Sequence, residues 1–259
     1  MATKRSNKRK QRNRGRFGFL YKFLSLVIIL VVLVAGCVVF FRVETVTVSG
    51  ESRYTAEEVV QASGILQGDN LILLSRMEVA RRIMSELPYV ENVSVRRALP
   101  DGVVIAVEEC RPAAVIQGEE SSNWWIINAA GKILEEASSG DVQGTAKISG
   151  LTAYAPAVGT MVKAGDENAM LLEDLLSLMQ ALEEQEMLEK VRAIDMSGGT
   201  EIAVDYDGWI TLEIDASADF AEEASMLKVI IDSGDIQSNE RGTIIKTQGG
   251  WYSFVPEGS

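Results

Sequence analysis

Apolar residues form one uninterrupted stretch near the start of the chain. Within residues 23–41, Ser25 and Cys37 carry the only side chains with a polar group. At 1.5 Å per residue, a helix over this stretch reaches about 28 Å, which is close to the thickness of a bilayer's hydrocarbon core. No second stretch of the sequence is as long and as apolar. The pattern therefore predicts a single transmembrane helix over residues 23–41.

In the next segment, apolar residues recur at the spacings typical of short strands and helices. Residues 43–48 alternate between faces, which predicts a strand. Two capping-box pairs predict the first turns of two helices: Thr55 with Glu58, and Ser75 with Glu78. A hairpin follows, with its two alternating strands joined at the Pro100-Asp101-Gly102 turn. Together these elements predict a compact βααββ unit.

Beyond Pro112 the pattern predicts a larger sheet covered by helices. Leucine and methionine recur at helical spacing across residues 167–188, and a second helix is expected over residues 218–233. The expected strands cover residues 113–117, 124–128, 132–134, 146–148, 191–196, 201–206, 209–214, 243–246 and 251–255. The predicted fold class is α+β, with a transmembrane helix, a βααββ domain and a mixed β-sheet domain packed with helices.

Charge is divided unevenly along the chain. The net charge is −12, yet residues 1–41 contain nine Lys and Arg and no acidic residue. Because basic flanks stay on the cytoplasmic side of a membrane, we expect residues 1–22 inside the cell and the chain from Arg42 onward outside, a type II topology. The remainder is strongly acidic, which argues against nucleic-acid binding by the body of the protein.

The apolar segment has two other possible interpretations, a cleaved signal peptide and a lipoprotein signal. A cleaved signal peptide usually has a shorter apolar region and a small-residue cleavage site, which this stretch lacks. The segment Leu33-Val34-Ala35-Gly36-Cys37 resembles the lipobox of bacterial lipoproteins, in which the cysteine is acylated. However, four more apolar residues follow Cys37, and a strand pattern begins at once. We therefore expect Cys37 to be an unlipidated residue within the membrane.

The sequence contains few of the residues from which a catalytic or metal site is usually built. It contains no histidine, which removes the commonest general base and zinc ligand. Two groups of carboxylates are expected on solvated surfaces: Glu183, Glu184, Glu186 and Glu189 on a helix, and Asp205, Asp207, Glu213 and Asp215 on a hairpin. Cys110 is expected to be a buried strand residue. We therefore predict no enzyme activity, no cofactor, no metal and no small-molecule substrate.

Residues 43–112 resemble a POTRA domain of the FtsQ/DivIB type. The matching motifs run in order along the unit: the Val-x-Val-Ser-Gly opening, Thr55-Ala56-Glu57-Glu58-Val59-Val60, Gly68-Asp69-Asn70-Leu71, Leu87-Pro88-Tyr89-Val90, and the Val93 strand leading to Pro100-Asp101-Gly102. The resemblance implies four parts: a basic cytoplasmic tail (1–22), a transmembrane helix (23–41), a POTRA domain (42–112) and a β domain of the FtsQ/DivIB type (113–259). One departure is that the Lys that usually opens the family's penultimate helix is not evident near Glu222 and Glu223.

The resemblance also implies a function. It predicts a non-enzymatic scaffold of the bacterial division machinery, located in the cell membrane at the septum. The implied partners are single-pass coiled-coil proteins similar to FtsB/DivIC and FtsL. The alternative function is that of a membrane-anchored POTRA protein of secretion or envelope assembly. A third class, an anchored cell-wall enzyme, would need a nucleophile or an acid–base pair that the sequence does not supply.

The last predicted strand is the candidate partner-binding site. Trp251, Tyr252, Ser253 and Phe254 bring three aromatic rings together, and Trp and Tyr are enriched at interface hot spots. An open sheet edge can accept a strand from a partner, and the resemblance points to the same region. Alternation sends Trp251 and Ser253 to one face and Tyr252 and Phe254 to the other. One pair is therefore expected in the core, and the sequence leaves open which.

Overall fold

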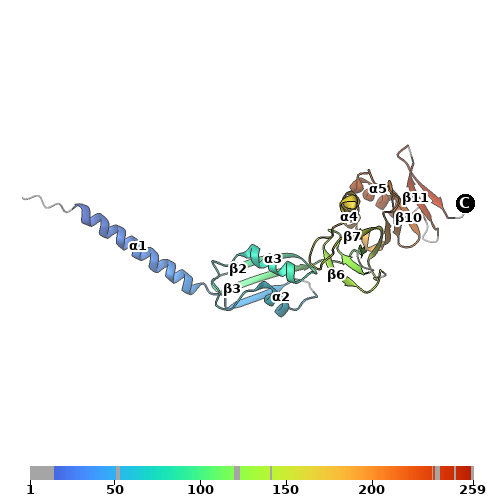
Figure 1. The fold of residues 1–259 in the computed structure, drawn as a ribbon. Helices are drawn as coiled ribbons and strands as arrows, with labels where there is room; N and C mark the ends of the chain where they lie inside the picture. Colours follow the sequence, from blue (N-terminus) through green and yellow to red (C-terminus); the bar gives the residue numbers. More distant parts are fainter. Residues whose placement is uncertain are drawn as a thin grey trace, which may run out of the picture.

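A long helix leads into two β-sheets that follow one another along an extended molecule (Figure 1). The computed structural model describes residues 15–50, 53–119, 123–140, 142–234, 236, 240–247 and 249–257. Helix α1 (Gly15–Phe40) includes the stretch Gly18–Gly36, the only candidate membrane span among these residues. No protein covers the side chains of that stretch. The predicted apolar helix is present, and its helical backbone extends to Gly15.

The smaller sheet has three of the described strands, and two helices pack on it. In chain order these are β1 (Thr45–Ser49), α2 (Ala56–Ser63), α3 (Arg76–Glu86), β2 (Val90–Ala98) and β3 (Gly102–Glu109). The strand order is β1-β3-β2, with β1 parallel and β2 antiparallel to the central β3. Val59, Leu71, Ile83 and Ile105 lie fully buried between helices and sheet. The predicted βααββ order is confirmed.

The two predicted capping boxes differ in the structure. At α2 both halves form: the Thr55 backbone N–H donates to the Glu58 carboxylate at 2.7 Å, and the Glu58 N–H donates to the Thr55 hydroxyl at 3.3 Å. At α3 the Glu78 N–H donates to Ser75 Oγ at 3.4 Å, whereas the Glu78 carboxylate pairs with Arg82 one turn later, at 3.2 Å. An (i, i+4) ion pair thus replaces the second half of that box.

The larger sheet contains nine of the described strands. They are β4 (Ala114–Gly118), β5 (Trp124–Ile127), β6 (Ile133–Ala137), β7 (Ala146–Ala153), β8 (Val191–Asp195), β9 (Glu201–Tyr206), β10 (Ile210–Asp215), β11 (Gly242–Lys246) and β12 (Tyr252–Pro256). Their order is β12-β11-β10-β9-β8-β7-β4-β5-β6. Helices α4 (Ala169–Glu184) and α5 (Phe220–Asp232) pack on one face through Leu175, Leu182, Phe220 and Leu227. Short 3₁₀ turns flank α4 at Asp166–Asn168 and Leu188–Lys190.

The long predicted helix over residues 167–188 is shorter than the sequence pattern indicates. It begins as a 3₁₀ turn, and α4 ends at Glu184. Glu186 adopts a left-handed backbone conformation with φ 56°, and the Met187 N–H returns to the Leu182 carbonyl at 2.8 Å. A left-handed residue closes a helix in this way, so Met187 and Leu188 lie beyond α4, with Leu188 in the following 3₁₀ turn.

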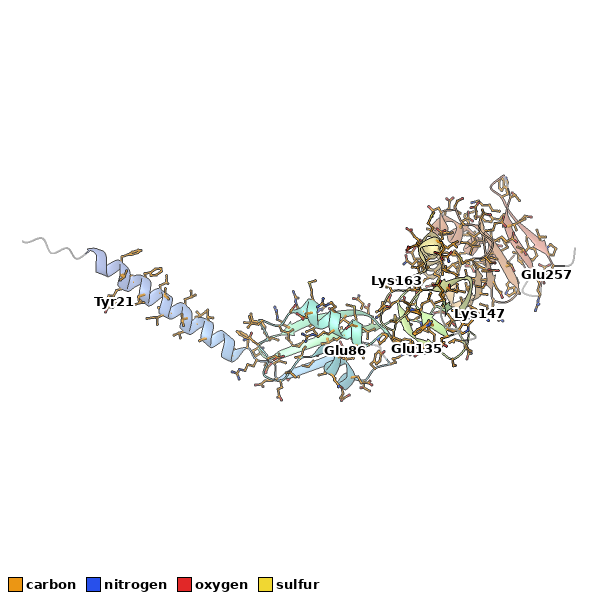
Figure 2. The ribbon with its side chains drawn as sticks, in the orientation of Figure 1. Tyr21, Glu86, Glu135, Lys147, Lys163 and Glu257 are labelled. Carbon is orange, nitrogen blue, oxygen red and sulfur yellow. The ribbon has the colours of Figure 1, made fainter. Side chains whose placement is uncertain are left out.

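The two sheets are connected by a joint that consists of polar contacts and an apolar cluster. The Lys132 ammonium, which precedes β6, donates to the carbonyls of Met84 at 3.1 Å and Val90 at 3.0 Å, and burial lowers the pKa of this lysine. The Arg53 guanidinium stacks 3.4 Å from the centre of the Tyr89 ring and pairs with Glu109. Glu86 of α3 and Glu135 of β6 lie on either side of this joint (Figure 2).

Cys110 belongs to the apolar part of the joint. It directly follows β3 and is fully buried in a cluster with Tyr89, Val115, Ile126 and Leu134. Its thiol lies 3.6 Å from the Pro88 carbonyl, and burial raises the pKa of the thiol. The structure confirms that Cys110 is buried, although it lies just past the end of the strand.

Candidate partner-binding edge

Strand β12 lies at one end of the large sheet. It pairs with β11 in antiparallel register, with Ile244 opposite Phe254 and Lys246 opposite Tyr252. None of the described strands pairs with its other side. The residues predicted as a binding site therefore lie at an open sheet edge, which can accept an added strand.

The register determines which peptide groups the edge offers. The Thr247 N–H donates to the Trp251 carbonyl at 2.8 Å, and the Glu257 N–H donates to the Arg241 carbonyl at 2.8 Å. Hydrogen-bonded pairs alternate with non-hydrogen-bonded pairs in an antiparallel ladder, so Ser253 and Val255 also bond to β11. The N–H and C=O groups of Tyr252 and Phe254 consequently point outward. Pro256 has no N–H, so the run of outward donors ends at Phe254.

The structure decides which aromatic residues face the core. Tyr252 and Phe254 are half-buried and pack against the main core cluster on the helix-covered face. Trp251, immediately before β12, has 78% of its surface exposed, and Ser253 is also exposed. Gly242 of β11 makes room for the Phe254 ring, because a Cβ at this position would lie 2.6 Å from the ring and 2.4 Å from the Val255 carbonyl oxygen. The four predicted residues thus form an edge with an inward and an outward face.

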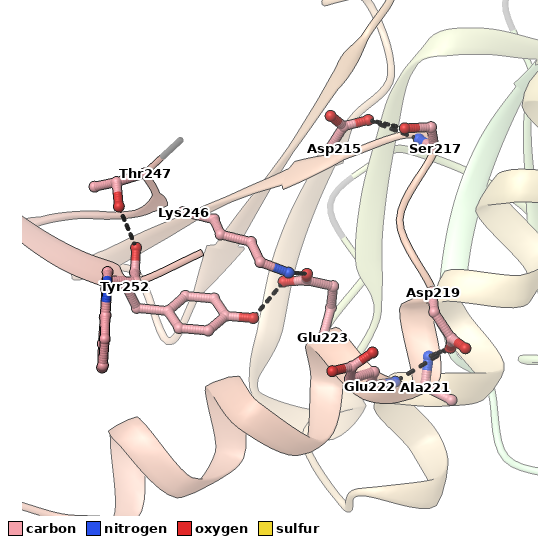
Figure 3. A network of polar contacts seen from close by, with 10 residues as sticks. Asp215, Ser217, Asp219, Ala221, Glu222, Glu223, Lys246, Thr247 and Tyr252 are labelled. Carbon is pink, nitrogen blue, oxygen red and sulfur yellow. Dashed lines mark hydrogen bonds and ion pairs between the residues drawn. The ribbon is translucent and has the colours of Figure 1, made fainter. Parts of the chain in front are cut away.

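A buried carboxylate of α5 anchors this edge (Figure 3). The Tyr252 hydroxyl donates to Glu223 at 2.7 Å, and Lys246 of β11 forms an ion pair with the other oxygen of the same carboxylate. Glu223 is 3% exposed. Burial, followed by the neighbouring Glu223, raises the pKa of Tyr252 to about 12, and the hydrogen bond to Glu223 raises the pKa of Lys246.

The sequence patterns do not predict Glu223 as part of the site. A signal was nevertheless present, because Glu223 lies at helical spacing among the apolar residues Phe220, Ala224 and Leu227 of α5. An acidic residue on the inward face of an amphipathic helix requires a partner, and here the partners come from β11 and β12. That pairing depends on contacts between elements far apart along the chain.

The other groups considered in the sequence lie on the surface. Asp207, Glu213 and Asp215 are exposed and Asp205 is half-buried, which confirms their predicted position on a solvated hairpin face. Glu183, Glu184, Glu186 and Glu189 are also exposed, as predicted, but only Glu183 and Glu184 belong to α4. The predicted helical position is wrong for Glu186, which has a left-handed backbone, and for Glu189, which lies in the following 3₁₀ turn. Within the described part of the chain, no group of three or more Cys, Asp or Glu residues is arranged to hold a metal ion.

Comparisons with known proteins match both the small unit and much of the remaining chain. Residues 41–109, which include β1 to β3, match the family model for the POTRA domain, FtsQ-type. The chain is 28% identical over 177 residues to the cell division protein FtsQ of Corynebacterium glutamicum, covering 65% of this chain and 71% of the relative. It is 26% identical over 158 residues to the cell division protein DivIB of Clostridium acetobutylicum, covering 61% of each. With the cell division protein DivIB of Clostridium botulinum the identity is 22% over 223 residues, covering 86% of this chain and 84% of the relative.

Proposed function

We propose that this chain is a non-enzymatic scaffold of the bacterial divisome. Its residues 41–109 match the FtsQ-type POTRA domain, and the chain is similar to the FtsQ and DivIB cell division proteins. It recruits or stabilises small single-pass partners similar to FtsB/DivIC and FtsL. The observation that carries the proposal is the open β12 edge, with outward peptide groups at Tyr252 and Phe254 and an exposed ring at Trp251.

The edge suits a partner that adds one β-strand. Backbone hydrogen bonds to the two outward residues supply pairing, and a side chain of the added strand can pack against Trp251. The Glu223 contacts keep Tyr252 and Lys246 in place before the partner arrives. An edge ordered in advance loses less conformational entropy on binding than a mobile one.

We propose a type II orientation for the same protein. The nine basic residues before residue 42 remain in the cytoplasm, and the two sheets lie outside at the division septum. External protease added to wall-stripped cells should degrade residues 42–259, and protection of that region would contradict this orientation. A fluorescent fusion should form a band at mid-cell. An even peripheral signal would instead favour a role in secretion or envelope assembly.

The partner-binding proposal is tested by removing one outward N–H while keeping every side chain. Semisynthesis of the C-terminal segment replaces the Phe254 amide by an ester, which deletes the N–H and retains the ring. Because one hydrogen bond contributes about 0.5–1.5 kcal/mol net, capture of the FtsB/DivIC-like partner by the full chain should weaken about two- to tenfold. The melting temperature should change little, because this N–H does not bond to β11.

The matched control is the same ester at Val255, whose N–H points toward β11. It should lower the melting temperature, because it weakens the pairing of β12 with its own sheet. Undiminished capture by the Phe254 ester would contradict strand addition at this edge. Deleting residues 249–259 provides a coarser test: if the folded remainder captured the partner with unchanged affinity, the docking site would lie elsewhere.

A further inference from the structure

The βααββ unit gathers its exposed apolar side chains at one end. Within residues 43–112, as far as the structure describes them, the large exposed apolar residues are Leu66, Ile72, Leu73, Met77 and Leu99. Leu73 and Met77 are 78% and 85% exposed. Singly scattered apolar residues are normal on a protein surface, but a cluster confined to one end calls for a partner.

Backbone hydrogen bonds place this cluster beside the end of α1. The Leu71 N–H donates to the Phe41 carbonyl at 2.9 Å, and the Val43 N–H donates to the Asp69 carbonyl at 2.8 Å. The hairpin turn that carries Leu99 is attached in the same way, because the Glu44 N–H donates to the Asp101 carbonyl at 2.8 Å. Both loops therefore flank the first residues after the apolar helix. The joint to the larger sheet is at the opposite end of the unit (Figure 1).

The loop that carries Ile72 and Leu73 is held in shape by polar contacts of its own. The Asn70 side-chain oxygen accepts the N–H groups of Ile72 at 2.9 Å and Leu73 at 3.1 Å. The Arg97 guanidinium donates to the carbonyls of Ile72 at 3.0 Å and Leu74 at 2.7 Å. Because these backbone groups already have partners within the unit, the loop can meet an apolar environment without leaving them unpaired.

We propose that these five side chains form an apolar base that rests in the outer surface of the bilayer from which α1 emerges. Helix α1 ends at Phe40, and the first backbone contact to the loop is made by Phe41. Since one residue spans at most about 3.6 Å, the loop cannot lie far from the membrane surface. The side chains enter the boundary between headgroups and acyl chains, as the apolar residues of interfacial segments do.

The charges at this end indicate which kind of lipid contact to expect. Three basic residues (Arg42, Arg76 and Arg97) and three acidic residues (Glu44, Asp69 and Asp101) lie on the segments that form this end, so neither sign predominates among them. Burial of apolar surface, and not attraction to anionic lipid, therefore drives the contact. The base would hold the βααββ unit in one orientation on the membrane. The inference depends on α1 spanning the membrane, but not on partner binding at β12.

The test compares two equally exposed positions in the full chain, reconstituted in vesicles of zwitterionic lipid. A nitroxide label is attached to Leu73→Cys or, as the matched control, to Met170→Cys on α4, since both native side chains are 78% exposed. Both variants carry Cys37→Ala, and Cys110 is fully buried. We expect the ratio of relaxation by membrane-soluble oxygen to relaxation by a water-soluble nickel chelate to be roughly fivefold higher at residue 73 than at residue 170.

Two further measurements strengthen the test. Adding Met77→Asp beside the labelled residue 73 should lower its ratio toward the control value, and raising the salt concentration should leave the ratio unchanged. Equal ratios at residues 73 and 170 would overturn the proposal. So would a label at residue 73 that becomes shielded only when the FtsB/DivIC-like and FtsL-like partners are added, because the surface would then be a protein interface. Neither result would affect the proposed role of β12.

Discussion

The hydroxyl of Tyr252 donates a 2.7 Å hydrogen bond to the carboxylate of Glu223, and this contact joins the edge strand β12 to helix α5. Glu223 is buried, and its other oxygen pairs with Lys246 of β11. One carboxylate therefore connects the last two strands to the helix layer. These contacts attach the candidate binding edge to the helix layer of the folded domain.

Replacing Tyr252 by Phe should destabilise this edge while keeping its ring. A hydrogen bond to a charged group contributes about 1.5–3 kcal/mol, but solvent reaches this half-buried site, so we expect a loss of about 1 kcal/mol. The corresponding fall in melting temperature is about 2–4 °C for a chain of this size. Tyr154→Phe, at an exposed tyrosine, is the matched control. Equal melting of the two variants would show that the Glu223 contact adds no stability.

The same contact predicts a dependence on alkaline pH. The folded-state pKa of Tyr252 is raised from 10 to about 12, first by burial and then by Glu223. Its contribution to stability is therefore complete below pH 10 and is lost as the pH rises from 10 to about 12, because only the unfolded chain releases the proton in that interval. Denaturant titrations should show the native chain losing stability faster than Tyr252→Phe over this range. Parallel curves would contradict the assignment.

Trp251→Ala should weaken partner capture without weakening the fold. The ring is 78% exposed and precedes the open strand, so it is available to a bound partner. Hot-spot truncations cost about 1–3 kcal/mol, which corresponds to roughly a 5- to 150-fold loss of affinity. Met170→Ala removes an equally exposed side chain from α4 and should leave the affinity unchanged. Titration calorimetry and thermal melting of both variants separate binding from stability.

Lys132→Met should loosen the joint between the two sheets. The ammonium satisfies the carbonyls of Met84 and Val90, and methionine fills similar space without a donor. Leaving a buried carbonyl unpaired costs about 1–3 kcal/mol, and because these contacts are only partly buried we expect a loss of about 1 kcal/mol. The distance distribution between spin labels on the two sheets should broaden, whereas Lys163→Met at an exposed position should not change it. A narrow distribution in both variants would assign the rigidity to the apolar cluster around Cys110.

Cys110 should resist thiol reagents in the folded chain. Its side chain is fully buried and burial raises the pKa of the thiol, so both access and the thiolate fraction are low. In a Cys37→Ala background, a chromogenic disulfide should react with less than about one-tenth of the chain until denaturant is added. Rapid reaction under native conditions would show that the joint opens.

Elements whose signals are local could be predicted from the amino-acid sequence. The apolar run around residues 23–41, the Thr55–Glu58 capping box and the turn at Pro100 each depend on residues close together in the chain, and each element appears in the structure. Alternation in the last strand likewise separated Tyr252 and Phe254 from Trp251 and Ser253. The family resemblance rested on such local motifs as well, because they lie in order along residues 43–112.

The side of each alternating pattern that faces the protein interior depends on contacts between elements and could not be predicted from the sequence. Alternation is the same whichever face is buried, so the inward position of Tyr252 became evident only when α5 placed Glu223 beneath it. The edge position of β12 depends on strand order, which no short motif specifies. The apolar base similarly joins Leu66 and Leu73 of the α2–α3 loop with Leu99 of the β2–β3 turn, because both segments bond to the chain just after α1. These features depend on strand pairing and side-chain contacts between segments that are far apart along the chain. A short motif does not specify such contacts, because it describes only neighbouring residues.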